Sequence, residues 1–223
     1  MHILLAAATT FEIQPTIDAL GNRRDPGPHR IEPLVTGVGG MATAWALMRQ
    51  IGSNRPDLII QAGIAGTLRG RLPGEVLVVG EDEPADTGVW EADRFKTIFD
   101  MRLADANARP YTNGRLVNPH GRLIALTGLE SVAGLTVNEI TTSTERIRWY
   151  QQNTPAVVES MEGAALHYVC LLEHVPFLQL RSVSNPVGVR DKTQWDIPGA
   201  IAALNERLIA LLDHPALQTD TEP

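Results

Sequence analysis

The chain has 223 residues, 43% of them hydrophobic and 20% charged, which is the size and composition of an ordinary globular domain. Its 19 basic and 26 acidic residues give a net charge of −7, which argues against a nucleic-acid-binding protein, because such proteins usually carry a clustered basic face. The single cysteine, Cys170, excludes an intrachain disulfide, and its apolar surroundings predict a buried core thiol.

The start of the chain is apolar over residues 2–8, but no basic region precedes this run and no convincing cleavage site follows it. We therefore interpret it as a buried first strand and not as a signal peptide. No apolar run approaches the roughly 20 residues that span a membrane. These features predict a cytoplasmic protein without a membrane partner.

Short β-rich runs alternate with longer helical patterns, which is typical of a mostly parallel sheet flanked by helices. The chain shows no repeat and no linker, so we expect a single domain over residues 1–223. The acidic segment 81–86 is expected to be a solvated loop, and the tail 214–223 is expected to fray. In chain order, strands are predicted at residues 3–8, 32–36, 58–61, 75–79, 123–126, 157–158 and 177–183, and helices at residues 11–20, 41–51, 139–152, 161–172 and 197–212.

Two glycine-rich turns follow predicted strands, at residues 37–40 (GVGG) and 63–66 (GIAG). Glycines at such places let backbone N–H groups approach a ligand, and both turns would face the same edge of the sheet. Neither turn fits the dinucleotide fingerprint or a phosphate loop. The six histidines are scattered without metal-ligand spacing, so no metal site is predicted.

Four polar residues lie where predicted elements begin or end. Glu12 follows the first strand, Glu162 opens a helix, Arg181 lies within the last strand, and Asn185 is expected to end that strand because Pro186 lacks an N–H. Each also has a purely structural interpretation. The two glutamates suit the start of a helix, Arg181 suits a buried ion pair, and Asn185 suits a turn.

The segment ESMEGAA (159–165), followed by PFLQLRSVSN (176–185), resembles the purine-nucleoside hydrolases and phosphorylases, in particular the branch containing methylthioadenosine/S-adenosylhomocysteine nucleosidase and futalosine hydrolase. This resemblance implies a three-layer α/β/α sandwich around a central mixed sheet. It also implies a small-molecule nucleoside substrate, no cofactor, and a homodimer in which a neighbouring subunit closes the pocket.

The resemblance assigns roles residue by residue. Glu12 would activate the attacking water with Arg181 nearby, since a positioned carboxylate accepts the proton of this weak nucleophile. Glu162 would accept hydrogen bonds from the ribose hydroxyls, and Met161 would pack against the sugar. Asn185 would receive the base. The remaining pocket residues implied by the resemblance are Ser184, Val137, Asn138, Gly66 and Ile64.

Asn185 stands where the adenosine-cleaving relatives carry an aspartate. A protonated aspartate suits the N7 atom and the amino group of adenine, whereas an amide offers N–H donors to the O6 atom of hypoxanthine. The resemblance therefore favours cleavage of futalosine into hypoxanthine and dehypoxanthine futalosine, a step toward menaquinone. Arg94, Lys96 and Arg102 are candidates for binding the benzoate-bearing tail of futalosine, and Trp195 is a candidate cap for the site.

Related phosphorylases carry arginines at two places that are occupied here by residues 8–10 (ATT) and by Gln61. Because a phosphate dianion calls for such cations, we interpret the chain as a hydrolase. Two alternatives stay open. One is a nucleosidase that releases adenine from methylthioadenosine, adenosylhomocysteine or aminofutalosine, and the other is a non-catalytic purine-binding module.

Overall fold

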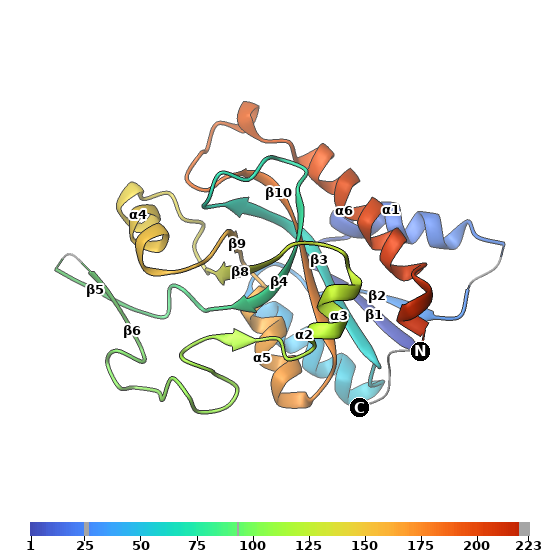
Figure 1. Ribbon diagram of the computed structural model, residues 1–223, viewed down its shortest axis with the longest axis horizontal. Coiled ribbons are helices and arrows are strands. Elements are labelled where there is room, and N and C mark those ends of the chain that lie inside the picture. Colours follow the sequence, from blue (N-terminus) through green and yellow to red (C-terminus); the bar gives the residue numbers. More distant parts are fainter. Residues whose placement is uncertain (25–26, 93, 219–223) are drawn as a thin grey trace.

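A mixed sheet of eight strands forms the centre of the computed structural model, which describes residues 1–24, 27–92 and 94–218 (Figure 1). A separate hairpin, β5 (Gly88–Glu91) and β6 (Arg94–Thr97), lies outside this sheet. The strands of the sheet are β1 (His2–Ala7), β2 (Arg30–Val35), β3 (Leu58–Thr67), β4 (Val76–Asp82), β7 (Leu116–Val117), β8 (Ser131–Thr136), β9 (Val158–Ser160) and β10 (Phe177–Pro186). The helices are α1 (Thr10–Gly21), α2 (Gly40–Ser53), α3 (Gly121–Leu126), α4 (Thr144–Asn153), α5 (Gly163–Glu173) and α6 (Ile197–Leu212), with short 3₁₀ turns at Lys192–Gln194 and Pro215–Gln218.

The strand pairings make the sheet mixed and partly closed. Strand β1 runs parallel to both β2 and β3, and β3 runs parallel to β10. From β10 the pairing continues antiparallel to β4, then parallel to β8 and β9, and β9 returns antiparallel to β3. Five strands therefore form a closed circuit, which brings the carboxyl ends of β3 and β10 beside the short strand β9.

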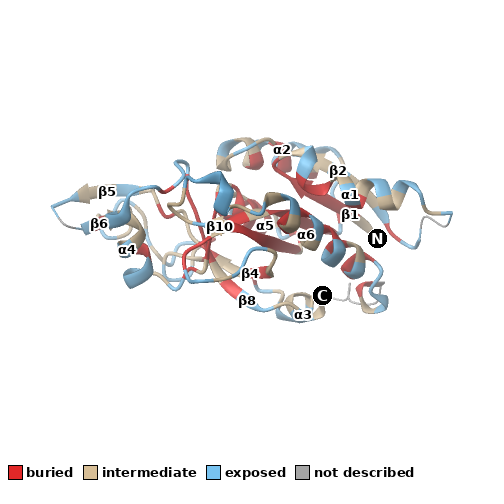
Figure 2. Cartoon of the chain, turned by 90° about the horizontal axis from the view of Figure 1, so that it is seen from above, coloured by how far each residue is buried: buried red, intermediate tan, exposed pale blue. Residues whose placement is uncertain are grey.

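Alternate residues of the central strands face two different sets of helices, because successive side chains of a strand point to opposite faces. On one face, side chains such as Leu5, Ile60 and Leu180 pack with Leu204 and Leu208 of α6. The other face holds Leu4, Ile59 and Phe177 with residues of α2 and α5, including Cys170. Figure 2 shows the buried strands enclosed by helices whose outer surfaces are exposed. The predicted core position of Cys170 is confirmed.

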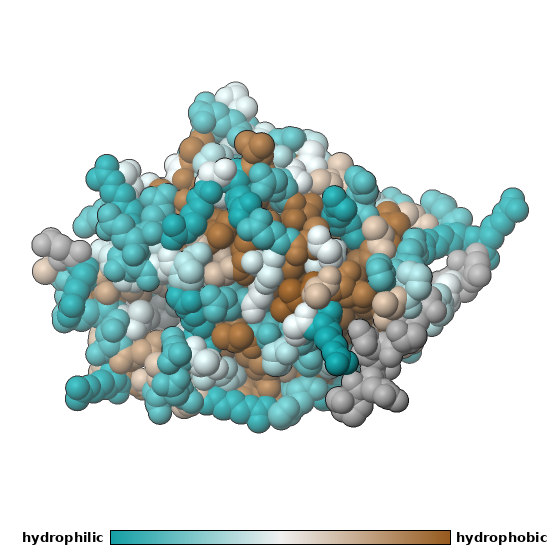
Figure 3. Space-filling model, viewed as in Figure 1, coloured by the Kyte–Doolittle hydropathy of each residue, from teal (hydrophilic) through white to brown (hydrophobic). Residues whose placement is uncertain are grey.

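The hairpin of β5 and β6 projects from the molecule next to α4 (Figure 1). Trp90 and Phe95 of the hairpin contact Trp149 of α4, with ring centroids 6.1 and 5.5 Å apart. Aromatic edge contacts of this kind explain how a two-stranded hairpin outside the main sheet is held. On the face drawn in Figure 3, apolar side chains gather in the middle and hydrophilic ones surround them.

The prediction for residues 123–126 is wrong, and the strand that follows them was not predicted. Residues 123–126 were expected as a strand, but they belong to helix α3. The strand of this region is β8, which begins five residues after the end of α3 and was not predicted. A run of four apolar residues fits a strand and one turn of helix equally well, and Gly134 weakens the alternating pattern of β8.

Several predicted boundaries also move. Helix α4 begins at Thr144 and not at 139, because the hydroxyl of Ser143 accepts a hydrogen bond from the Arg146 N–H at 3.3 Å and caps it. Helix α5 begins at Gly163, which leaves Met161 and Glu162 in the preceding turn. Strand β10 includes Pro186, because the ladder continues through the N–H of Val187 to the Thr67 carbonyl.

Two expectations about solvated segments are wrong. Asp82, within the acidic segment 81–86, is only 1% exposed. Leu217, in the tail expected to fray, is buried in the core beside α6. Residues 219–223 of that tail lie outside the described residues. None of the helices in the described ranges combines the length and the apolar character needed to cross a bilayer.

Candidate active site

Glu12 lies in the first turn of α1, directly after β1, and is buried. Its Oε2 atom accepts hydrogen bonds from the backbone N–H and the hydroxyl of Thr9, both at 3.0 Å. Its Oε1 atom accepts the N–H of Ile64 at 3.1 Å, across the turn at the end of β3. Since each carboxylate oxygen has two lone pairs, one acceptor position remains on Oε1. Thr9 thus fixes the helix start, and Oε1 is the oxygen left to accept a proton.

Glu162 and Arg181 form a buried ion pair. The Nη2 atom of Arg181 lies 3.4 Å from Oε2 of Glu162 and also donates to Oε1 of Gln61 at 3.0 Å. The other carboxylate oxygen of Glu162 accepts the N–H of Gly39 at 3.1 Å, in the first glycine turn. The carboxylate partner of Arg181, which the sequence left undetermined, is therefore Glu162.

Glu12 and Arg181 approach the same side of Gly63. A Cβ atom at this position would lie 2.8 Å from Oε1 of Glu12 and closer still to Nη1 of Arg181. Both charged groups therefore rest against the bare backbone of Gly63, which pairs with Arg181 in the β3–β10 ladder. The expectation that Arg181 lies near Glu12 agrees with this geometry. The glycine turn was predicted from the sequence, but the close approach of the two charged groups to Gly63 was not.

Asn185 and Ser184 lie at the end of β10. The Ser184 hydroxyl is 2.8 Å from Oδ1 of Asn185 and 3.2 Å from the Ala65 carbonyl oxygen, while Nδ2 of Asn185 donates to the Pro186 carbonyl at 2.9 Å. A carbonyl oxygen only accepts, so the amide atom facing Pro186 is the nitrogen. This orientation directs the Asn185 oxygen to Ser184, and one N–H of the amide has no hydrogen-bond partner within residues 1–24, 27–92 and 94–218.

The other predicted pocket residues lie on several elements, and Ile64 and Gly66 of β3 contact Glu12 and Asn185, respectively. Gly66 pairs with Asn185 in the β3–β10 ladder, and Ile64 donates its N–H to Glu12. Val137 is buried in a cluster with apolar side chains of α4, and its N–H donates to the Ser160 carbonyl. Asn138 is exposed, and its N–H and its side-chain amide both donate to Asp86. Met161, half-buried, directly precedes Glu162 at the start of α5.

A polar layer beneath the site holds the start of α5. The buried Asp82 carboxylate accepts the Thr136 hydroxyl at 2.8 Å and the Gln179 amide at 3.1 Å. Thr136 in turn accepts the Ala164 N–H at 2.8 Å, in the first turn of α5. The side chains of Asp82 and Gln179 fill the space that a Cβ at Gly163 would need. Burial raises the pKa of Asp82 to about 6.

Of the four other candidates, Trp195 adjoins the site, since the N–H of the next residue, Asp196, donates to the Ser184 carbonyl at 2.9 Å, and the other three lie on or after the hairpin of β5 and β6. Trp195 donates its indole N–H to the Val189 carbonyl at 2.9 Å, within the loop after β10. Lys96 pairs with Glu91 inside the hairpin, Arg94 is exposed on the same hairpin, and Arg102 is exposed in the irregular segment after it. Within residues 1–24, 27–92 and 94–218, no three His, Cys, Asp or Glu side chains form a group able to hold a metal ion.

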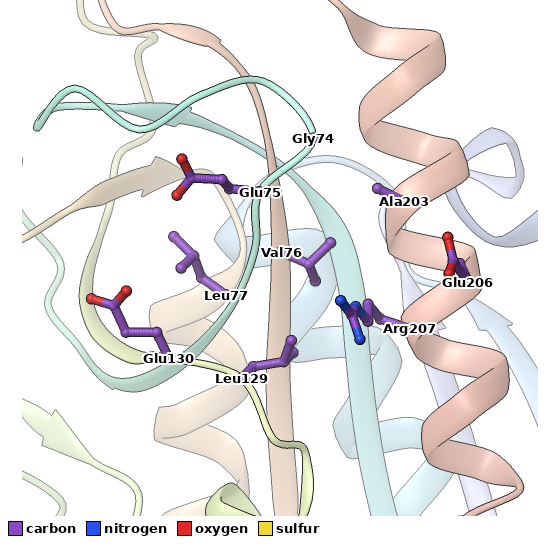
Figure 4. Close-up of a pocket in the computed structure, with 9 residues that line it drawn as sticks. All are labelled: Gly74, Glu75, Val76, Leu77, Leu129, Glu130, Ala203, Glu206 and Arg207. Atoms are coloured by element: carbon purple, nitrogen blue, oxygen red, sulfur yellow. The ribbon is translucent and has the colours of Figure 1, made fainter.

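A cavity of about 330 Å³ lies between α6 and the beginning of β4 (Figure 4). Its lining includes Glu75, Leu77, Glu130 and Arg207 but none of the predicted site residues. The predicted site residues gather instead around the carboxyl ends of β3 and β10. Open α/β sheets bind ligands at this edge.

Comparison with known proteins identifies the class to which this fold and site belong. The sequence profile that describes the phosphorylase superfamily matches residues 33–214 of this chain. The chain therefore belongs to the phosphorylase superfamily.

Within that class, curated relatives carry more particular names. The chain is 33% identical to futalosine hydrolase of Streptomyces coelicolor, with 92% of this chain and 93% of the relative covered. It is 32% identical to futalosine hydrolase of Thermus thermophilus, over 80% of each chain. A 5'-methylthioadenosine/S-adenosylhomocysteine nucleosidase of Haemophilus ducreyi is 26% identical, with 81% of this chain and 79% of the relative covered.

Solved structures agree on the fold. Native futalosine hydrolase of Helicobacter pylori superposes with a TM-score of 0.80 at 17% identity, covering 96% of this chain and 97% of that one. The 5'-methylthioadenosine/S-adenosylhomocysteine nucleosidase of the same species, solved with butyl-thio-DADMe-Immucillin-A, also gives 0.80 at 17% identity, covering 96% and 98%. The mixed α/β fold with its central mixed sheet is therefore the nucleoside phosphorylase fold, as the sequence predicted.

Proposed function

We propose that this chain is an enzyme that hydrolyses the N-glycosidic bond of futalosine, releasing hypoxanthine and dehypoxanthine futalosine in the biosynthesis of menaquinone. The observation that carries the proposal is the approach of Glu12 and Arg181 to the bare backbone of Gly63, with Glu162 paired to Arg181. The names of the relatives at 32% and 33% identity support the same reaction.

In this proposal Glu12 is the general base. Three protein donors hold its carboxylate, and the remaining acceptor position on Oε1 takes the proton of the attacking water. Arg181, beside it, stabilises negative charge at the carboxylate and the incoming oxygen. Because Arg181 is already paired with Glu162, its charge is not free to bind a phosphate dianion, which supports water as the nucleophile.

Glu162 and Met161 hold the ribose. Oε1 and Oε2 of Glu162 each have one protein partner, so both keep an acceptor position for a vicinal diol. Asn185, oriented by Ser184, directs its free N–H toward the departing 6-oxopurine, and stabilising that leaving group lowers the barrier. Val137, Asn138, Gly66 and Ile64 complete the walls around the base and the sugar.

Replacement of Glu12 tests this mechanism. In Glu12→Gln we expect the rate of hypoxanthine release from futalosine to fall by a factor of about 10²–10⁴, because the amide cannot accept the proton of water. Glu145→Gln is a matched control, since Glu145 is an exposed glutamate in the first turn of another helix. A Glu12→Gln protein that releases hypoxanthine at the rate of the control would contradict the proposal and favour a non-catalytic purine-binding protein.

An adenine-releasing nucleosidase is the second candidate function. It is supported by the similarity to the Haemophilus ducreyi 5'-methylthioadenosine/S-adenosylhomocysteine nucleosidase. The same Glu12, Glu162 and Arg181 arrangement serves both reactions. The choice between them rests on the base, and Asn185 supports hypoxanthine.

The proposal extends to the organisation of the protein. We propose that residues 1–223 form one domain, that the helices on the two faces of the sheet make it a three-layer α/β/α sandwich, and that the protein acts in the cytoplasm without a cofactor. We also propose a homodimer. Helices α2 and α5 pack together and expose apolar side chains at helical spacing, which are Met41, Trp45 and Met48 on α2 and Tyr168 and Leu172 on α5. A second copy of the chain would cover this surface.

A further inference from the structure

The side-chain amide of Asn205 is buried between helices α6 and α1. Asn205 belongs to α6 and is only 2% exposed. Its Oδ1 atom accepts hydrogen bonds from the N–H of Thr16 at 3.0 Å and from the Thr16 hydroxyl at 2.6 Å. Its Nδ2 atom donates to the carbonyl oxygens of Glu12 and Ile201, both at 2.8 Å. Both donors and both acceptor positions of this amide are therefore used.

These partners also fix the orientation of the amide. A carbonyl oxygen only accepts, so the atom that faces Glu12 and Ile201 is the nitrogen. An N–H only donates, so the atom that faces the N–H of Thr16 is the oxygen. Because the reverse orientation would set like groups against each other, Asn205 holds α1 in one place relative to α6.

The two backbone groups of α1 that Asn205 binds are the two ends of one helical hydrogen bond. In a regular α-helix the N–H of Thr16 would donate to the carbonyl of Glu12, four residues earlier. Pro15 lies between them, lacks an N–H of its own and crowds the carbonyl of Phe11, which weakens the start of α1. The Asn205 amide therefore supports, from another helix, the turn that its own sequence weakens.

Support for this turn is also support for the Glu12 carboxylate. Thr9, at the start of the same helix, holds Oε2, while Oε1 reaches across to the backbone of Gly63. Gly63 and Arg181 belong to the sheet, whereas Glu12 belongs to α1. A shift of the start of α1 would therefore move Oε1 relative to Gly63 and Arg181.

Helix α6 is itself anchored on the other side of the site. The Asp196 carboxylate caps its start by accepting the N–H of Gly199 at 2.8 Å, and the N–H of Asp196 donates to the Ser184 carbonyl at 2.9 Å. Ser184 directly precedes Asn185. Helix α6, which lies beside α1 in Figure 1, thus connects the end of β10 to the turn that carries Glu12.

We propose that Asn205 is a positioning residue that acts through Glu12, by holding the start of α1 where Oε1 of Glu12 meets the attacking water. The inference rests on the proposed function and adds to it a residue that touches neither the substrate nor the water. Because Asn205 acts on the general base alone, its loss should lower kcat and leave KM for futalosine, which Glu162 and Asn185 determine, nearly unchanged.

Asn205→Leu tests the role, because it removes the amide with little change of side-chain volume. We expect kcat for hypoxanthine release from futalosine to fall at least about tenfold, since misplacing a catalytic group by about 1 Å can cost about 10²-fold in rate. KM should change by less than about twofold. Leu211→Ala, which leaves a cavity under the same helix six residues further on, is the matched control. The control should lower the melting temperature but leave kcat unchanged at temperatures where the protein is folded.

A double-mutant cycle separates positioning from a purely structural role. In a protein that already carries Glu12→Gln, Asn205→Leu should lower the residual rate by less than about twofold, because the group that it positions is gone. An equal loss in both backgrounds would overturn the inference, and so would an Asn205→Leu protein with the kcat of the control.

Should Asn205→Leu not fold, the same cycle with Asn205→Asp decides, because the carboxylate keeps the bonds from Thr16 and sets an oxygen against the Glu12 carbonyl. The outcomes also separate this inference from the proposed function. If Glu12→Gln lowers hypoxanthine release and the Asn205 variants do not, only the role of Asn205 is overturned. If wild-type protein releases no hypoxanthine from futalosine, the proposed function itself fails.

Discussion

The absence of a side chain at Gly63 allows Glu12 and Arg181 to approach the same point of the backbone. Gly63→Ala should force both charged groups to move, since its Cβ would lie 2.8 Å from Oε1 of Glu12 and closer to Arg181. Misplacement of catalytic groups by about 1 Å can cost about 10²-fold in rate, and we expect a loss of that order in kcat on futalosine.

A matched control for Gly63→Ala is Gly52→Ala, because a Cβ at Gly52 of α2 meets no atom within 4 Å. The control should keep full activity and should be as stable as wild type or slightly more stable. Full activity in Gly63→Ala would show that the close approach of the two charges at this glycine is dispensable.

The Asn185 amide is the residue-scale determinant of the leaving group. In Asn185→Asp, one carboxyl oxygen would face the Pro186 carbonyl, which favours the protonated acid that suits adenine. We expect the ratio of kcat/KM for methylthioadenosine to that for futalosine to rise by about tenfold or more, the scale of one hydrogen bond. An active variant with the wild-type ratio would argue against base recognition by Asn185.

At the scale of elements, Asp82 joins β4 to β8, β10 and the start of α5. Its pKa is raised from 3.8 to about 6 in the folded protein, so the folded state holds this proton at a higher pH than the unfolded chain does. Ionisation of Asp82 therefore lowers stability progressively as pH rises from about 4 to about 6, and a shift of about two pKa units corresponds to about 3 kcal/mol.

Asp82→Asn removes this titration. The amide can still accept from Thr136, and Gln179 can turn its unpartnered oxygen toward the new N–H. Measured by urea unfolding, the stability of Asp82→Asn relative to wild type should rise by about 3 kcal/mol between pH 4 and pH 7. The exposed control Asp105→Asn should not reproduce this rise, and a pH-independent difference for Asp82→Asn would contradict the argument.

The helices and strands that were predicted differ from those that were missed in the clarity of their apolar pattern. Long apolar segments such as α6 and the first part of β10 were predicted because burial on a face leaves a clear pattern. The strand β8 was missed because six residues with a central glycine leave little pattern, and the four apolar residues of α3 do not distinguish a strand from a helix.

In the candidate site too, local features were predicted from the sequence and long-range contacts were not. The acidic and amide residues at element ends were predicted, and family resemblance supplied their roles. Their partners were not, because the pairing of Arg181 with Glu162 depends on the β3–β10 register and on the bare backbone at Gly63, which are long-range properties.

At the scale of the whole molecule, the exposed apolar side chains of α2 and α5 predict self-association. Trp45 is 64% exposed and lies in the middle of the α2 stripe. Trp45→Glu should weaken the proposed dimer by at least about 2 kcal/mol, as expected for a buried aromatic anchor, and sedimentation velocity would detect the resulting monomer. Leu72→Glu is the control, because Leu72 is equally exposed between β3 and β4 and away from both helices. A wild-type protein that is monomeric at high concentration would contradict the proposal.

The most direct test of the central claim is release of free base from futalosine, inosine and methylthioadenosine, each with and without phosphate, followed by chromatography. We predict hypoxanthine from futalosine at a rate that does not depend on phosphate. Adenine from methylthioadenosine as the main product would retain the mechanism but contradict the base assignment, and release only in the presence of phosphate would contradict hydrolysis.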